Sequence, residues 1–219
     1  MCHQQQMNTI PSTMKLLIFG ATGTVGQQLV AQALEAGHEV TAFTRNTSSI
    51  TPKPGLCVAQ GDVLNAQQVR KAMGQHDAVM VALGAGRKGG VRAEGTRNII
   101  NAMQQAGIQQ LICQTTLGCG QSWGNLNFFW KNVMFGWFIR AAFQDHELQE
   151  QYVRGSRLQW TIVRPGAFTN GPRTGQYKHG FNTKERSLAL KISRADVAHF
   201  MLKALGKPAY RHQMIGLSY

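Results

Sequence analysis

Short apolar runs alternate with segments of helical spacing along the first half of the chain. Each run is short and rich in apolar residues, which predicts buried strands at Lys15–Gly20, His38–Thr44, Leu56–Ala59, Asp77–Leu83 and Gln110–Thr115. Apolar residues at helical spacing predict helices over Thr24–Ala36, Gln67–Met73 and Val91–Ala106. Strands that alternate with helices indicate parallel βαβ units, so we expect a single-domain α/β protein with a doubly wound parallel sheet and helices on both faces.

The alternation breaks after Thr115. The segment Thr116–Phe143 is rich in Gly, Trp and Phe and is too long for an ordinary connection, which predicts a functional loop. Some of its aromatic residues have helical spacing, so a core role for them is the open alternative. Beyond it we predict a helix over Asp145–Arg154, a strand over Gln159–Arg164, a second loop over Pro165–Thr183 and a helix over Ser193–Leu205 that opens on a capping-box-like pair, Ser193 and Asp196.

The length and composition predict one folded domain. The chain has 219 residues, 43% of them hydrophobic, which excludes a disordered protein. We assign residues 14–219 to the domain and the polar, Gln-rich residues 1–13 to a frayed extension that lacks the apolar centre of a signal peptide. No apolar run reaches the ~20 residues of a membrane span, and no cysteine has the spacing of a zinc site. We therefore expect a cytoplasmic monomer with no membrane span and no metal.

The formal net charge of +13 indicates a basic surface. Nucleic acid, an anionic membrane surface and an acidic small molecule are each compatible partners, and charge alone does not choose among them. The basic residues are scattered and form no recognition motif. A binder of specific nucleic acid or of anionic lipid is therefore the weakest of the function classes that the sequence suggests.

A glycine-rich motif connects the first predicted strand to the first predicted helix. It reads Gly20-Ala21-Thr22-Gly23-Thr24-Val25-Gly26. Glycines allow a tight turn and let the backbone approach a pyrophosphate, which the N–H groups and partial positive charge of the helix N-terminus then bind. The motif predicts a dinucleotide site.

Three further positions follow strands in the order that a dinucleotide site requires. Arg45 comes after the second strand, where an arginine suits a ribose 2′-phosphate and an acid would suit a free hydroxyl; the sequence therefore favours NADPH. Asp62 and Val63 follow the third strand and are candidates for adenine contacts. Leu83 and Gly84 begin a turn of small residues after the fourth. A solvated arginine without a ligand is the alternative for Arg45.

Several of these runs together resemble a known family. KLLIFGATGTVGQQLV, GDV, DAVMVALG, EGTRNIINAM and WTIVRPG are similar to the atypical short-chain dehydrogenase/reductase family, which comprises NmrA-like Rossmann proteins that bind NAD(P), and within it to NADPH-dependent reductases of biliverdin and flavins. The resemblance implies that Gly20, Thr22, Gly23, Thr24, Val25 and Gly26 cradle the diphosphate. It further implies cofactor contacts for Arg45, Asp62, Val63, Leu83, Gly84, Arg87, Thr115, Pro165 and Gly166.

The chain departs from the wider family at the proton relay. The Tyr-x-x-x-Lys pair is absent, and the corresponding positions hold Ala142 and His146. Reduction of a planar conjugated acid such as biliverdin or FMN does not need that pair. We expect Thr116 beside the reacting atoms, with His146 and Asp145 as the nearby acid–base candidates. The predicted substrate contacts are Trp123, Arg140, Ala167, Phe168 and Arg173. A non-catalytic sensor of NADP(H) is the alternative function.

Overall fold

The computed structural model describes residues 13–84 and 89–219. Its parallel core is formed by the strands β1 (Lys15–Phe19), β2 (Glu39–Thr44), β3 (Leu56–Gln60), β4 (Ala78–Val81), β5 (Gln110–Gln114), β6 (Gln159–Pro165) and β10 (Gln213–Ser218). Shorter strands are β7 (Ala167–Thr169), β8 (Lys178–His179) and β9 (Lys191–Ser193). The helices are α1 (Thr24–Glu35), α2 (Ala66–Met73), α3 (Val91–Ala106), α4 (Arg140–Gly155) and α5 (Arg194–Lys203).

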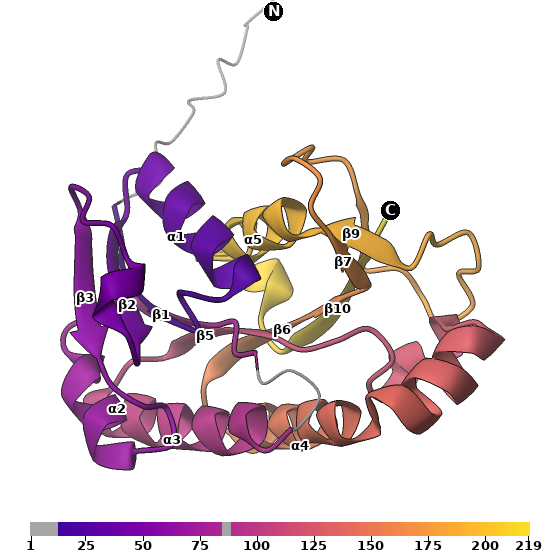
Figure 1. The fold of residues 1–219 in the computed structure, drawn as a ribbon, viewed down its shortest axis with the longest axis horizontal. Coiled ribbons are helices and arrows are strands. Elements are labelled where there is room, and N and C mark those ends of the chain that lie inside the picture. Colours follow the sequence, from indigo (N-terminus) through magenta and orange to yellow (C-terminus); the bar gives the residue numbers. More distant parts are fainter. Residues whose placement is uncertain (1–12, 85–88) are drawn as a thin grey trace, which may run out of the picture.

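The main sheet has eight strands in the order β3-β2-β1-β4-β5-β6-β10-β8 (Figure 1). Its neighbouring strands are parallel except for β8, which runs antiparallel to β10 at one edge. The order β3-β2-β1-β4-β5-β6 is that of a doubly wound Rossmann-like sheet. This confirms the predicted fold class. Within the described residues, no helix combines the length and the apolar character needed to cross a bilayer.

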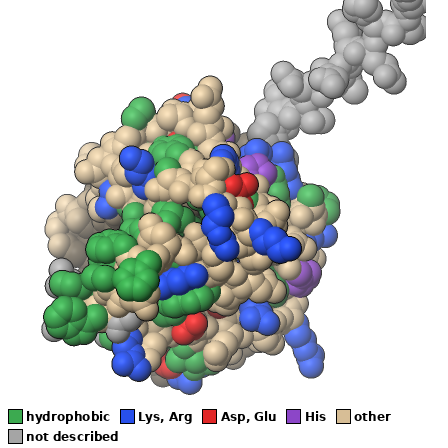
Figure 2. Space-filling view, turned by 90° about the vertical axis from the view of Figure 1, so that its right-hand side faces the viewer, with side chains coloured by type: hydrophobic (Ala, Val, Ile, Leu, Met, Phe, Trp, Pro, Cys, Tyr) green, Lys and Arg blue, Asp and Glu red, His purple; other side chains and the backbone are tan. Residues whose placement is uncertain are grey.

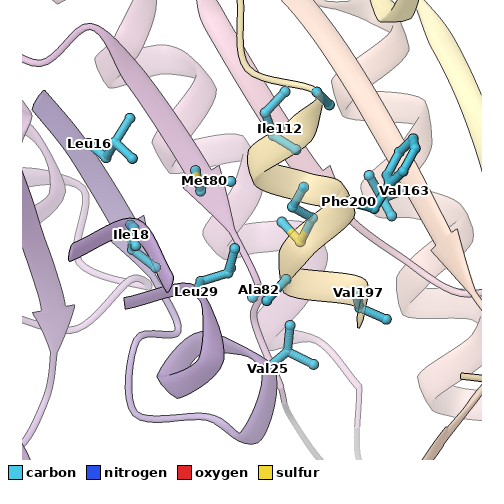
Figure 3. Packing of buried hydrophobic residues seen from close by; sticks show 14 of the residues in the cluster. Leu16, Ile18, Val25, Leu29, Met80, Ala82, Ile112, Val163, Val197 and Phe200 are labelled. Atoms are coloured by element: carbon cyan, nitrogen blue, oxygen red, sulfur yellow. The ribbon is translucent and has the colours of Figure 1, made fainter. Parts of the chain in front are cut away.

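Helices cover both faces of the sheet. Helices α1 and α5 pack together on one face, while α2, α3 and α4 cover the other (Figure 1). Successive side chains of a strand point to opposite faces, so Leu16 and Ile18 enter the core beneath α1 and α5 (Figure 3), and Leu17 and Phe19 enter the core on the opposite face. Because both faces are buried, these strands read as continuous apolar runs.

The long segment after β5 is largely helical, contrary to the predicted loop over Thr116–Phe143. A 3-10 turn spans Gly120–Asn125, a π-helical segment spans Phe129–Phe138, and α4 begins at Arg140 instead of Asp145. The helical spacing of the aromatic residues therefore does correspond to a helical segment, but the aromatic residues at that spacing are not buried in the core. Phe129 and Trp137 are 53% and 79% exposed, and Phe135 is the segment's buried aromatic residue.

The C-terminal part of the chain differs from the sequence prediction in its strands and in its helix cap. The short strands β7 and β8 lie within the segment Pro165–Thr183 that was predicted to be a loop. Strand β10 was not predicted, although it pairs with β6 and lies between β6 and the edge strand β8. Ser193 caps α5 as predicted, because its hydroxyl accepts from the Asp196 N–H at 3.0 Å. The reciprocal half of the capping box does not form: Asp196 accepts from the 174–175 backbone and from Tyr219, and the Ser193 N–H donates to the Tyr219 hydroxyl.

Candidate functional site

The loop between β1 and α1 is tightly packed against the end of β4. Gly20 has a φ of +80°, and a Cβ there would lie 2.3 Å from the Ala82 carbonyl oxygen. A Cβ at Gly26 would lie 2.0 Å from the carbonyl oxygen of Gly20. Both positions therefore require glycine. Gly23 is the N-cap of α1, and its N–H donates to the Gly20 carbonyl at 2.9 Å.

This loop forms one wall of a cleft of about 310 Å³, which we call the glycine-loop cleft. The other walls come from the segments that follow β2, β3 and β4, at the carboxyl edge of the sheet where ligands bind in such folds. The structure brings most of the predicted cofactor residues together there: the cleft is lined by Gly20, Thr22, Gly23, Arg45, Asp62, Val63, Leu83 and Gly84, among others.

Local contacts fix the part of the cleft that follows β3. The Asp62 carboxylate accepts from the Leu64 N–H at 2.9 Å, and the Asp62 N–H donates to Gln68 Oε1 at 2.7 Å. Val63 is buried against Gly95, where a Cβ would meet it at 2.8 Å. An apolar side chain therefore lines the cleft next to a half-exposed carboxylate, which suits the face and the amino edge of a purine. Arg45 is exposed and also lines an adjoining outer groove of about 830 Å³ with Lys71.

Two residues of the glycine motif have roles outside the cleft. Val25 is buried between α1 and the sheet, in the core that α1 shares with α5. The Thr24 hydroxyl accepts from Arg194 Nε at 2.9 Å, which ties the start of α1 to the start of α5. Of the six predicted diphosphate contacts, Gly20, Thr22 and Gly23 line the cleft, and the buried Gly26 does not.

A second cavity, also of about 310 Å³, lies where β5 and β6 end. We call it the aromatic cavity. Its walls are Thr116 and Leu117 after β5, the turn Pro165–Phe168 after β6, and the inner side of the π-helical segment. At Gly166 a Cβ would lie 2.7 Å from the Leu190 carbonyl group, so only glycine fits that turn. Its full lining is Thr116, Leu117, Leu126, Trp130, Met134, Phe135, Ile139, Pro165, Gly166, Ala167, Phe168, Leu190 and Arg194.

Arg194 is the functional candidate that sequence reasoning missed. It is half-buried at the edge of the aromatic cavity, and its guanidinium lies 5.3 Å from the centre of the Phe168 ring. It donates to Asn170 Oδ1 at 2.6 Å as well as to Thr24. It therefore joins the glycine loop to the cavity and places a cation between them. No sequence signal marks it, because its partners are 24 and 170 residues away.

The side chains of Thr115 and Thr116 lie in different surroundings. The Thr115 hydroxyl donates to Glu150 Oε1 at 2.7 Å inside the protein, and this residue, for which a cofactor contact was predicted, is not among those that line the cavity. Arg164 completes the network, with Nε 2.9 Å from Oε1 and one terminal nitrogen 2.5 Å from Oε2 of Glu150. Both charged side chains are buried. Thr116 is half-buried and lines the cavity, where its hydroxyl lies 3.3 Å from the Leu117 carbonyl oxygen.

The two predicted acid–base candidates do not reach the aromatic cavity. Asp145 is buried and accepts from the N–H groups of Arg92 and Ala93 at 3.1 and 3.0 Å, so its carboxylate anchors the start of α3. The His146 ring contacts Gln149 Oε1 at 3.2 Å. Burial, with the nearby positive charge of Arg92, lowers the pKa of His146 from its ordinary value of 6.5 to about 4. His146 is therefore neutral near pH 7.

The predicted substrate residues also separate into two groups. Ala167 and Phe168 line the aromatic cavity. Trp123, Arg140 and Arg173 are not among its lining residues: Trp123 packs on Phe143 with ring centres 5.6 Å apart, Arg140 is exposed at the start of α4, and Arg173 forms an exposed ion pair with Glu35. The structure thus places two of the five predicted contacts at the cavity and three outside its lining. Arg87 lies outside the described residues.

Comparison with known proteins identifies the family. A family model described as NAD(P)H-binding matches residues 20–208, which is most of the chain. The chain belongs to this NAD(P)H-binding family. The resemblance to the atypical short-chain dehydrogenase/reductases is thereby confirmed, and NAD(P)H is the cofactor of the domain. The residues present fit it, because the glycines let the loop pack tightly at the N-terminus of α1, and this loop and an exposed arginine line the same cleft.

Individual relatives agree with this assignment. ChuY, an anaerobilin reductase of Escherichia coli O157:H7, has a TM-score of 0.79 at 28% identity, with 93% of this chain and 96% of that chain covered. A short-chain dehydrogenase/reductase of Veillonella parvula, solved in complex with NADP, has a TM-score of 0.80 at 20% identity, with 94% of each chain covered. A 3-beta-hydroxysteroid dehydrogenase of Mycolicibacterium neoaurum is 35% identical over 112 residues, which are 45% of this chain and only 31% of that protein.

Arg45→Ala should lower the affinity for NADP⁺ about ten- to a hundred-fold, because a charge-assisted contact to the 2′-phosphate is worth roughly 1.5–3 kcal/mol. The affinity for NAD⁺, which has no such phosphate, should change little. Titration calorimetry with both cofactors measures the two constants. Lys71→Ala, in the outer groove beyond Arg45, is the matched control. Equal affinities of the wild type for the two cofactors would contradict the assignment of Arg45.

The low pKa of His146 predicts a loss of stability in mild acid. Between about pH 6.5 and pH 4 the unfolded chain binds a proton at this residue that the folded protein does not, so the free energy of unfolding falls as the pH falls through that range. His146→Gln keeps a polar contact to Gln149 and removes the titration. Urea unfolding near pH 7 and near pH 5 should show a smaller acid loss in the variant. An equal loss in both proteins would assign the effect to other groups.

Proposed function

We propose that the protein is an NADPH-dependent reductase that delivers a hydride to a planar, conjugated, acidic acceptor of the bilin or flavin type. The observation that carries the proposal is the aromatic cavity. It opens at the carboxyl ends of β5 and β6, where such sheets place the reacting end of a dinucleotide, and Arg194 connects it to the glycine loop. The relationship to ChuY, which is named as an anaerobilin reductase, supports the same acceptor class.

The residues of this chain act by binding and orienting. NADPH, when bound, supplies the hydride. The glycine loop fixes the diphosphate end, and Thr116 with the Pro165–Gly166 turn sets the position of the nicotinamide end against the acceptor. Trp130, Phe135 and Phe168 offer ring faces and edges to a planar acceptor. Arg194 provides a cation for a propionate or a phosphate group.

Among the described residues that line the cavity, no side chain is placed to donate the proton as the Tyr–Lys pair of related enzymes does. Helix α4 contains no Tyr-x-x-x-Lys pair, and its His146 is a neutral ring bonded to Gln149. The acceptor's proton therefore comes from water. The buried network of Thr115, Glu150 and Arg164 holds the end of β5 in place, so that Thr116 keeps its orientation.

His146→Gln should consequently reduce turnover by much less than the ~10²–10⁴-fold that removal of a general acid causes. The Michaelis constant for NADPH should also change little, since the ring lines neither cavity. Steady-state assays at saturating NADPH measure both quantities. A thousand-fold fall in turnover with intact cofactor affinity would show that this histidine takes part in proton transfer.

The decisive experiment measures NADPH oxidation with a panel of acceptors: biliverdin isomers, anaerobilin, FMN, FAD and a quinone. We expect turnover with at least one bilin or flavin and a rise in the Michaelis constant of that acceptor when Arg194 is replaced by leucine. Arg173→Leu, which removes an exposed arginine from outside the cavity, is the matched control. Tight NADPH binding without oxidation of any acceptor would refute the reductase and favour the NADP(H) sensor.

A further inference from the structure

The π-helical segment Phe129–Phe138 presents aromatic residues on two sides. Its inner side, with Trp130, Met134 and Phe135, lines the aromatic cavity. Its outer side, together with the preceding residue, is exposed: Phe128 by 78%, Phe129 by 53%, Trp137 by 79% and Phe138 by 51%. We call these four residues the aromatic face. The cavity explains the aromatic residues of the inner side, but it does not explain those of the outer side.

Four large aromatic side chains on one short segment form an unusual surface. Single exposed apolar residues are ordinary in a monomer, but a group of them marks an interaction site. The other exposed large apolar residues of the described chain are less exposed: Val58 by 39%, Leu64 by 49%, and Trp123, Leu148 and Phe168 by 38% each. The aromatic face is thus a local feature of this segment.

Positive charge predominates around the aromatic face, with one acidic residue, Glu185, at the neighbouring 3-10 turn, where its carbonyl accepts from Asn125. The sequence contains no acidic residue between Glu94 and Asp145, while Lys131 lies within the segment and Arg140 comes two residues after its end. Arg186 joins them from another loop, because it donates to the Gly124 carbonyl in the neighbouring 3-10 turn. Figure 2, which views this end of the molecule, shows hydrophobic side chains gathered on one side with Lys and Arg side chains beside them.

We propose that the aromatic face docks on an anionic phospholipid surface. Trp and Phe side chains insert readily at the level of the lipid headgroups, and the flanking cations pair with lipid phosphates. The two most exposed rings, Phe128 and Trp137, lie at opposite ends of the segment, which suits a deformable layer better than one preformed protein pocket. The net charge of +13 attracts the whole molecule to such a surface.

Charge complementarity favours lipid over a second copy of the chain. A symmetric dimer through this face would bring Lys131 and Arg140 of one protomer against the same residues of the other, and two protomers of charge +13 repel. Docking would also place the aromatic cavity beside the lipid, because the same segment forms its wall. The proposal itself does not depend on the reductase activity, since its readouts are binding measurements.

The test is sedimentation of the full-length protein with phosphatidylcholine vesicles, with and without phosphatidylglycerol. We expect binding to the anionic vesicles that weakens as salt is added. The double variant Phe128→Ser, Trp137→Ser should lower the partition coefficient at least about ten-fold. Val58→Ser, which removes an exposed apolar residue from the edge strand β3, should bind like the wild type.

A second measurement avoids dependence on a disruptive variant. Tryptophan fluorescence of the wild type should be quenched by brominated lipids in anionic vesicles, and Trp137→Phe should keep vesicle binding while losing most of that quenching. Circular dichroism and NADP⁺ affinity verify that each variant is folded. Failure to bind anionic vesicles, or unchanged binding of the double variant, would overturn the proposal. So would a dimer, detected by light scattering, that the double variant dissociates.

Discussion

Replacement of Gly23 by valine is expected to abolish NADP⁺ binding while the protein remains folded. Gly23 has an ordinary φ of −70°, and a Cβ there would lie 3.1 Å from the Gly20 carbonyl oxygen, a contact that a small shift relieves. The branches of valine would extend into the space that the pyrophosphate must enter, in front of the α1 N-terminus. We expect a loss of affinity of at least about a hundred-fold, or roughly 2.7 kcal/mol.

Two other glycines separate this effect from damage to the fold. Gly155→Val, at the end of α4 where a Cβ would meet nothing within 4 Å, should keep the cofactor affinity. Gly26→Val should instead impair folding, because its Cβ would lie 2.0 Å from the Gly20 carbonyl oxygen. Titration with NADP⁺ and thermal unfolding measure the two properties. If Gly23→Val retained micromolar affinity, the glycine loop would not be the phosphate site.

Removal of the Glu150 carboxylate should have the largest effect on stability. In Glu150→Ala the Arg164 guanidinium stays buried without the partner that now accepts two of its hydrogen bonds, and the Thr115 hydroxyl loses its acceptor. Breaking one side of a buried ion pair costs about 3–5 kcal/mol, because the remaining charge keeps its desolvation penalty. Urea unfolding should show a loss of that size in the free energy of unfolding.

The exposed ion pair between Arg173 and Glu35 is the control for this prediction. The side chains are 43% and 62% exposed, so solvent screens their attraction and Glu35→Ala should cost no more than about 1 kcal/mol. The combined change Glu150→Met and Arg164→Met should cost less than Glu150→Ala alone, because it leaves no unpaired charge. Similar losses for Glu35→Ala and Glu150→Ala would show that burial does not control the strength of the inner pair.

The sequence by itself determined the elements whose signals are local. The strand-to-helix glycine motif and the apolar runs of the predicted parallel strands depend on a few neighbouring residues, and the structure reproduces them. Arg45, Asp62 and Leu83 gather in one cleft because each directly follows a parallel strand, and the carboxyl ends of such strands share one edge of the sheet.

Only the tertiary structure decided the features that depend on partners distant in the chain. Strand β10 has a weak signal of its own and forms because β6 offers it an open edge. Contacts between residues that lie 35 to 170 positions apart decide three further features: the inward orientation of the Thr115 side chain, the capping of α3 by Asp145 and the position of Arg194. The spacing of the aromatic residues indicated a helix in Phe129–Phe138, but spacing alone does not determine which side of a helix packs against the rest of the protein. That depends on where the segment lies against the end of the sheet, and here it leaves Phe128 and Trp137 exposed.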